Sequence, residues 1–328
     1  PFDITNPGGT FIFAFGGLTL IILMSAISAL LWHLRVIPLI VNALSVLFKK
    51  PLGVGGPIGL GATANVFLGQ VEAPLLIKPY LSSMTRHELL IIMTVGMSTI
   101  AGSVMVVYTT MLFPIYGPRL IGHFLSASLI SVPAAIMYAN MMIPSNAKTD
   151  FPDEKSDDMY SSIMDAITQG TKNGLDIFLN VIAMLIVVMA LVFLVNSILG
   201  LLPNLNGNPI TLELMLGYLF APLAWFMGIP WNESIMAGQL LGVKTALNEF
   251  VAYLYLSDTE TYQLGDKSRM IMLYALCGFA NFSSVGILLS GLSAMVPERR
   301  ADLISVSGKA LWCALLASCL TGFIIGIL

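Results

Sequence analysis

The sequence predicts an all-α, multi-pass membrane protein. Of its 328 residues, 57% are hydrophobic and only 10% are charged, whereas soluble domains average about 25% charged residues. The apolar residues form long blocks along the whole chain, which is typical of membrane helices and not of the alternating strands of a β-barrel. Two blocks are broken at corresponding places, which predicts two inverted repeats, each with a re-entrant helical hairpin and an interrupted transmembrane helix.

The composition also excludes several classes of function. The net charge is -3 and no basic patch is present, so we expect no nucleic-acid partner. Cys277, Cys313 and Cys319 lie within apolar segments, which predicts neither a disulfide framework nor a zinc site. The chain starts at Pro1 with no signal-peptide pattern, so we expect it to begin partway into a longer natural chain.

The first half of the chain combines apolar runs with one broken segment. Residues 53–80 contain six glycines and three prolines, which interrupt a helix and free backbone groups that lipid cannot satisfy. We therefore expect this segment to enter the membrane, turn and leave on the same side. The expected elements of this half are a spanning helix at 10–34, an interfacial helix within 36–48, the hairpin at 53–80, and spans at 89–113 and 120–143.

The second half repeats this order after a polar segment at 145–173, which is expected to be a solvent loop or a short surface helix. The repeats are predicted at residues 36–146 and 210–328. Each contains a span with a polar, glycine-containing middle, at 96–103 and at 277–286. The expected elements of the second half are a span at 175–202, an interfacial helix at 210–229, a broken hairpin at 230–256, and spans at 270–296 and 301–328.

Each broken hairpin places an amide next to a carboxylate: Gln70 with Glu72, and Asn248 with Glu249. Carboxylates at membrane depth are expensive unless they are paired or line a cavity, so they indicate a functional site. A purely structural role, held by a neighbouring helix, is the alternative. The position of both pairs on matching broken segments favours the binding site of a secondary transporter.

Other polar residues in the apolar blocks support weaker interpretations. Asn65 and Thr99 provide oxygen atoms for a hard cation, and carbonyl groups freed by the helix breaks could complete its coordination. Ser284 lies in the middle of a span, where a hydroxyl can also bond back to the helix and have no further role. Lys78 and Lys244 are expected to extend their amines to the membrane interface.

The predicted site is rich in carboxylates and amides and has no cluster of arginine or lysine. Phosphorylated or strongly anionic ligands require such cationic partners. Carboxylates accept hydrogen bonds from paired hydroxyls, and glutamine or asparagine can match the donors and acceptors of a polar ring. The site therefore favours a neutral ligand that carries several hydroxyls and amide-like edges.

Several motifs resemble the concentrative nucleoside transporter family. The similarity extends from about Thr10 to the end of the chain. Three motifs carry most of this resemblance: GQVEAPLLIKPY at 69–80, NEFVAYL at 248–254 and CGFANFSSVGIL at 277–288. Two further stretches also resemble the family, namely APLAWFMGIPWNE, which begins at Ala221, and the PERR turn at 297–300.

The resemblance implies a bacterial inner-membrane symporter that imports nucleosides such as uridine with sodium, by an elevator-like movement. It implies a homotrimer in which residues 10–34 and 175–202 belong to a central scaffold and the two repeats form an outer transport domain. No cofactor is implied beyond the coupling ion. The implied substrate-binding residues are Gln70, Val71, Glu72, Val104, Glu249, Phe279, Asn281 and Ser284. The implied sodium ligands are Asn65, Thr99 and the carbonyls of Leu68 and Ile100.

The chain departs from the family pattern in places. Val71 stands where members often have serine or threonine, which affects the preference between purine and pyrimidine bases. Thr99 stands where serine is expected and keeps the hydroxyl oxygen. The family's bacterial members have further helices before the segment that matches Thr10.

Three alternatives to sodium symport remain at this point. The first is a proton-coupled nucleoside carrier in which Glu72 carries the proton. The second is a membrane-embedded enzyme. The sequence argues against it because it shows neither a metal-binding cluster nor a nucleophile with a paired base. The third is a channel, although paired hairpins suit alternating access better than a permanent pore.

Overall fold

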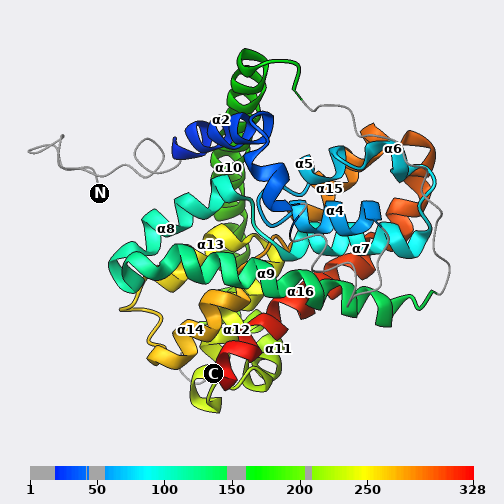
Figure 1. Ribbon diagram of the computed structural model, residues 1–328. Helices are drawn as coiled ribbons and strands as arrows, with labels where there is room; N and C mark the ends of the chain where they lie inside the picture. Colours follow the sequence, from blue (N-terminus) through cyan, green and yellow to red (C-terminus); the bar gives the residue numbers. More distant parts are fainter. Residues whose placement is uncertain (1–18, 42, 44–55, 146–159, 204–208) are drawn as a thin grey trace, which may run out of the picture.

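The computed structural model describes residues 19–41, 43, 56–145, 160–203 and 209–328 (Figure 1). These residues form helices joined by turns and irregular segments, with no β-strand in the described ranges. The prediction of an all-α chain is therefore confirmed for this part of the protein. Residues 10–18 of the first predicted span and 53–55 of the first predicted hairpin lie outside the described residues.

Helix α2 (Leu20–His33) packs along α10 (Ile163–Leu199), which is the long helix in the upper centre of Figure 1. The two backbones approach closely because Gly174 has no side chain: a Cβ there would lie 2.7 Å from the Cα of Ile22. Helix α10 begins at Ile163, where the Ser162 hydroxyl accepts a hydrogen bond from the Asp165 N–H. Helix α10 therefore begins before the predicted span at 175–202 and includes the end of the segment that was predicted to be a solvent loop or a short surface helix.

The first half contains the expected breaks. Residues 36–41 are helical, and most of the rest of the predicted interfacial helix lies outside the described residues. The hairpin segment is interrupted at residues 65–71, and the following span is interrupted at residues 99–101, inside the glycine-rich stretch that predicted a break. The helices of this half are α4 (Gly56–Ala64), α5 (Glu72–Leu75), α6 (Lys78–Leu81), α7 (Arg86–Ser98), α8 (Gly102–Tyr116) and α9 (Leu120–Met142).

The second half follows the same order. A helix break at residues 247–248 interrupts the hairpin segment, and a break at 276–281 interrupts the next span. The helices before the first break, α11 and α12, are bent by 117° relative to each other. The helices of this half are α11 (Leu212–Phe226), α12 (Trp231–Ala246), α13 (Glu249–Ser257), α14 (Asp266–Ala275), α15 (Phe282–Met295) and α16 (Arg300–Ile327).

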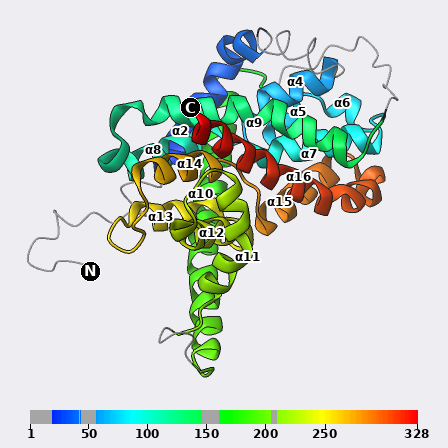
Figure 2. The same ribbon diagram turned by 90° about the horizontal axis from the view of Figure 1, so that it is seen from below.

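Helix α16 joins the two halves into one core. It packs against α7 and α9 of the first half and against α14 of the second, and Figure 2 shows it beside α7 and α9. Its buried face is lined with small residues such as Ala310, Ala314 and Ala317. Close packing through small side chains is the usual contact between membrane helices.

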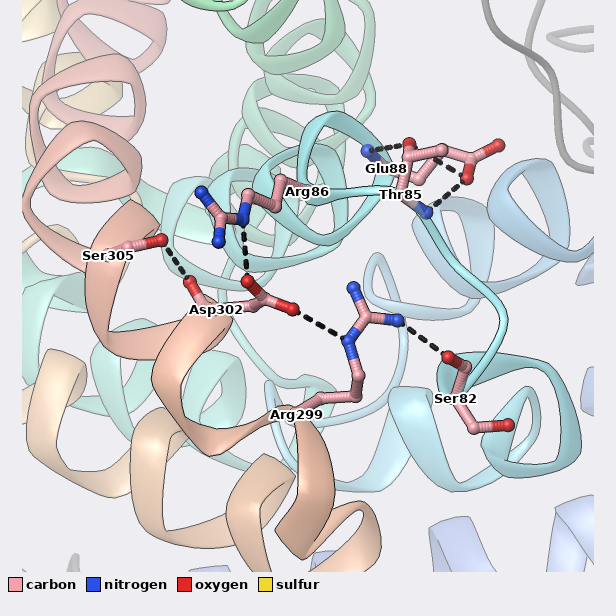
Figure 3. Close-up of polar contacts among 7 residues, drawn as sticks. All are labelled: Ser82, Thr85, Arg86, Glu88, Arg299, Asp302 and Ser305. Atoms are coloured by element: carbon pink, nitrogen blue, oxygen red, sulfur yellow. Dashed lines mark hydrogen bonds and ion pairs between the residues drawn. The ribbon is translucent and has the colours of Figure 1, made fainter.

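A polar cluster at one end of α16 fixes the turn after the first hairpin (Figure 3). The Arg299 guanidinium donates to the Ser82 carbonyl at 2.6 Å and to the Asp302 carboxylate at 2.8 Å. Arg86, at the start of α7, donates to the other oxygen of Asp302. Thr85 and Glu88 form a capping box at the start of α7, beside this cluster. The PERR turn therefore links the end of the first hairpin to the last helix.

Two helical stretches of the described residues, Arg86–Met142 and Pro297–Ile327, are long and apolar enough to cross a membrane. The bent pair of α11 and α12 passes the same test when its two helices are taken together. The first stretch includes the break between α7 and α8 and the turn at 117–119 before α9. It therefore contains both of the spans that were predicted at 89–113 and 120–143.

Candidate functional site

A cavity of about 460 Å³ lies where the broken segments of both halves meet, and its volume is within the usual range of small-molecule sites. The irregular segment before α5, helix α8, the starts of α13 and α15, and helix α10 all contribute to its walls. The residues that the resemblance assigned to the substrate all line this one cavity. They are Gln70, Val71, Glu72, Val104, Glu249, Phe279, Asn281 and Ser284.

The Glu249 carboxylate is held in place from two sides. The Tyr108 hydroxyl donates to one of its oxygens at 2.7 Å, and the Asn281 side-chain amide donates to the other at 2.8 Å. Glu249 is the first residue of α13 and is only 5% exposed. A helix N-terminus stabilises negative charge, and each carboxylate oxygen can accept a further hydrogen bond. The Glu249 carboxylate is thus held in a fixed position at the cavity wall and keeps lone pairs that can accept further hydrogen bonds.

Asparagine residues set the starts of the two helices that point at the cavity. The side-chain oxygen of Asn281 accepts from the Ser284 N–H at 2.7 Å, and that of Asn248 accepts from the Val251 N–H at 2.9 Å. These are N-caps, which asparagine favours because its oxygen satisfies a free backbone donor. Asn248, which the sequence paired with Glu249 as a ligand contact, therefore uses its oxygen to begin α13.

The breaks in the two interrupted helices touch each other. Gly278 has a φ of +141°, a conformation that residues with a side chain rarely adopt. A Cβ at this position would lie 2.7 Å from the Ser98 carbonyl oxygen at the end of α7. The glycine therefore permits both the backbone conformation and the close approach that bring residues 276–281 against the first break.

The irregular segment before α5 and the first residue of that helix contribute two polar side chains to the cavity wall. Gln70 is 8% exposed, and its side-chain oxygen is buried without a hydrogen-bond partner among the described residues. One oxygen of Glu72 accepts from the Gly69 N–H at 3.0 Å. Val71 packs against Gly291 of α15, where a Cβ would lie 2.7 Å from the valine side chain. The side of the cavity formed by the first hairpin thus offers an amide oxygen and a carboxylate.

Asn65 is fully buried at the break that follows α4. Its side-chain nitrogen donates to the Gly61 carbonyl at 3.0 Å, whereas its side-chain oxygen has no hydrogen-bond partner. The Gly102 N–H donates to the Phe67 carbonyl at 3.1 Å, which holds the segment after Asn65 against the break between α7 and α8. A buried oxygen without a donor is costly, and a hard cation would satisfy it.

The other residues predicted to bind sodium lie on the same two breaks. Thr99 is 1% exposed, and its hydroxyl donates to the Val95 carbonyl at 3.1 Å. That bond uses its hydrogen and leaves oxygen lone pairs for a cation. Leu68 and Ile100 are buried in the two irregular segments that the Phe67 contact brings together. The donor set therefore fits a cation that prefers oxygen ligands.

Three polar residues of the cavity wall were missed from the sequence. Tyr108 contacts Glu249 from α8, 141 positions away along the chain, and no local pattern indicates such a contact. Asn173 and Asp176 line the cavity from α10. Asp176 lies inside the apolar run that was predicted as a span, so the rule that singled out Glu72 would also have found it.

Comparison with protein-family models gives two matches. Residues 123–326, more than half of the chain, match a model described as the Na+ dependent nucleoside transporter C-terminus. Residues 14–114 match a model described as Gate, nucleoside recognition. Together they cover most of the two halves that form the cavity.

Curated relatives and solved structures agree with these matches. The nucleoside permease NupC of Helicobacter pylori is 36% identical over 97% of this chain and 76% of its own length. Solute carrier family 28 member 3 of Homo sapiens is 33% identical over 99% of this chain and 50% of its own length. CNTnw in an inward-facing substrate-bound state has a TM-score of 0.90 and 34% identity, covering 99% of this chain and 77% of its own.

A CNTnw variant in an outward-facing state gives a TM-score of 0.89. These relatives are transporters and permeases of the membrane, not enzymes, which excludes the membrane-embedded enzyme considered from the sequence. By its matched models, its relatives and its fold, the chain is an integral membrane nucleoside transporter and belongs to the concentrative nucleoside transporter family.

Proposed function

We propose that the protein imports nucleosides such as uridine by sodium symport across a bacterial inner membrane. The observation that supports this proposal is the cavity in which residues of both halves converge on Glu249. A named permease and a sodium/nucleoside cotransporter are among its relatives.

In this proposal the ribose lies at the second hairpin and the base at the first. Glu249 accepts hydrogen bonds from ribose hydroxyls, and Asn281 and Ser284 hold the sugar beside it. Gln70 and Glu72 face the base, because the unpartnered amide oxygen of Gln70 can accept from a ring N–H of uracil. Val71, Val104 and Phe279 provide apolar contacts around the ring.

We place the sodium ion between the breaks at 65–71 and 99–101. Asn65 and Thr99 provide side-chain oxygens, and the carbonyls of Leu68 and Ile100 complete the coordination. The unpartnered oxygen of Asn65 supports this position, because it is buried and lacks a donor. The ion lies on the same irregular segment as Gln70, so its binding orders the wall of the cavity that faces the base.

Movement of the site across the membrane follows the elevator scheme in our proposal. Residues 10–34 and 175–202 form a fixed scaffold, and the two repeats carry the cavity past it as one unit. CNTnw has been observed in an inward-facing state, and variants of it in outward-facing and intermediate states, which supports a movement between such states in this fold. Apolar side chains such as Phe193 on α10 and Phe226 on α11 are exposed, and we expect lipid or other copies in a homotrimer to cover them.

The test of this proposal is uptake of labelled uridine into proteoliposomes that contain the purified protein. Three conditions are compared: an inward sodium gradient, an inward proton gradient, and no gradient. Accumulation above equilibrium with the sodium gradient alone is the expected result, since the ion stabilises the binding-competent hairpin.

Accumulation with protons alone would contradict sodium coupling. The two cavity carboxylates, Glu72 and Glu249, give this second candidate a physical basis, since either is a candidate proton carrier. Failure to accumulate uridine, adenosine and cytidine under every gradient would contradict nucleoside import itself. Empty liposomes and liposomes with heat-denatured protein provide the background.

A further inference from the structure

Lys244 is a buried charge that the proposed transport cycle does not use. It lies in the last turn of α12, has no exposed surface, and is not part of the cavity wall. The sequence predicted that Lys244, like Lys78, would extend to the membrane interface. Lys78 is exposed, but the Lys244 amine instead donates to the Ala275 carbonyl at 2.8 Å, so the prediction for Lys244 was wrong.

The position of this amine is suited to a positive charge. Ala275 is the last residue of α14, where backbone carbonyls lose their helical partners and the helix dipole is negative. No ion pair joins Lys244 to a carboxylate among the described residues. The amine therefore stabilises the helix break that follows α14.

The two halves of the chain place different polar groups at their corresponding helix breaks. In the first, the segment after α4 lies against the break that follows α7, and the Asn65 oxygen there has no donor. In the second, α12 lies against the break that follows α14, and Lys244 provides a donor with a positive charge. The first half thus presents a side-chain oxygen at its break, whereas the second half presents a positively charged side chain.

We propose that Lys244 is the built-in cation of the second half, taking at the end of α14 the role that a bound ion takes at the end of α7. This inference rests on the sodium site of the proposed function. Lys244 acts as a positioning residue: it holds the break at 276–281 and does not touch the substrate. The second half consequently needs no ion from solution.

The test separates the charge of Lys244 from its volume. Lys244→Met keeps the length of the side chain and removes the charge, and we expect uridine uptake per folded protein to fall by roughly ten-fold or more. Lys244→Ala should lose uptake similarly and regain much of it when ethylammonium is added. Ethanol, a neutral molecule of similar size, should give no recovery. Lys267→Met, at the exposed opposite end of α14, is the matched control and should transport like the parent.

A second measurement keeps the test independent of transport. Ethylammonium should raise the melting temperature of Lys244→Ala and leave that of the parent unchanged, because a ligand that binds only the folded state stabilises it. The inference would be overturned if Lys244→Met took up uridine at the parental rate, or if ethanol restored uptake by Lys244→Ala as well as ethylammonium does. It would also be overturned if ethylammonium left the melting temperature of Lys244→Ala unchanged. If the parent itself transports no nucleoside, the proposed function fails, whereas the melting shift still tests the built-in cation.

Discussion

Glu249→Gln is expected to weaken uridine binding by roughly ten- to a hundred-fold, because a hydrogen bond to a charged group contributes about 1.5–3 kcal/mol. Glutamine keeps the size of the side chain but replaces one acceptor oxygen with a donor. That donor faces either the Tyr108 hydroxyl or the Asn281 amide, both of which donate to Glu249 in the parent. The substitution therefore removes acceptors for ribose and disturbs the network that holds the site.

The dissociation constants of uridine and 3′-deoxyuridine, measured by calorimetry on purified protein, check this prediction. The parent should prefer uridine, and the preference should largely disappear in Glu249→Gln, because the lost bond is one to a sugar hydroxyl. Glu260→Gln changes an exposed carboxylate in the turn after α13 and should bind both ligands like the parent. Equal uridine affinity in Glu249→Gln and the parent would remove Glu249 from the ribose site.

Asn65→Ala is expected to raise the sodium concentration required for half-maximal uptake by roughly ten-fold or more, since it deletes one oxygen ligand of a charged ion. The reason is that the Asn65 oxygen is fully buried and has no hydrogen-bond donor among the residues that the structure describes. The maximal rate at saturating sodium should fall less than the sodium affinity. Uridine uptake over a series of sodium concentrations, at constant ionic strength, measures both quantities.

A matched substitution on α4, just before the break that contains Asn65, separates ion binding from stability. Thr63→Val removes a buried hydroxyl that donates only to the Gly59 carbonyl of α4 at 2.7 Å. It should lower the melting temperature of the protein and leave the sodium dependence as in the parent. An Asn65→Ala protein with the parental sodium dependence would show that this asparagine has only a structural role.

Much of the architecture could be predicted because membrane helices and their breaks leave strong local signals. Glycine and hydroxyl residues around Thr99 indicated the break between α7 and α8, and the polar run before Ser284 indicated the break before α15. Glu249 and Asn281 were assigned to one binding site because of the family motifs, since the spacing of the two residues along the chain does not indicate that they meet. Local rules place an element and its breaks, but they do not say which breaks meet.

The failures have a common physical cause, which is that partners distant in sequence decide the position of a polar group. Tyr108 resembles an ordinary aromatic residue of a span until the start of α13 is placed against it. Lys244 resembles an interfacial lysine until the end of α14 provides a carbonyl. The polar stretch before residue 175 resembles a loop or a short surface helix in the sequence. In the structure its end belongs to α10, where Gly174 packs closely against α2.

The central claim is that a cation bound at Asn65 and a nucleoside bound at Glu249 stabilise the same arrangement of the two hairpins. The most direct test is the dissociation constant of uridine measured at increasing sodium concentration, with choline replacing sodium to keep ionic strength constant. Binding free energies of coupled sites are reciprocal, so uridine should bind more tightly as sodium rises, and Asn65→Ala should shift this dependence to higher sodium. A uridine dissociation constant that is the same at every sodium concentration would contradict the account.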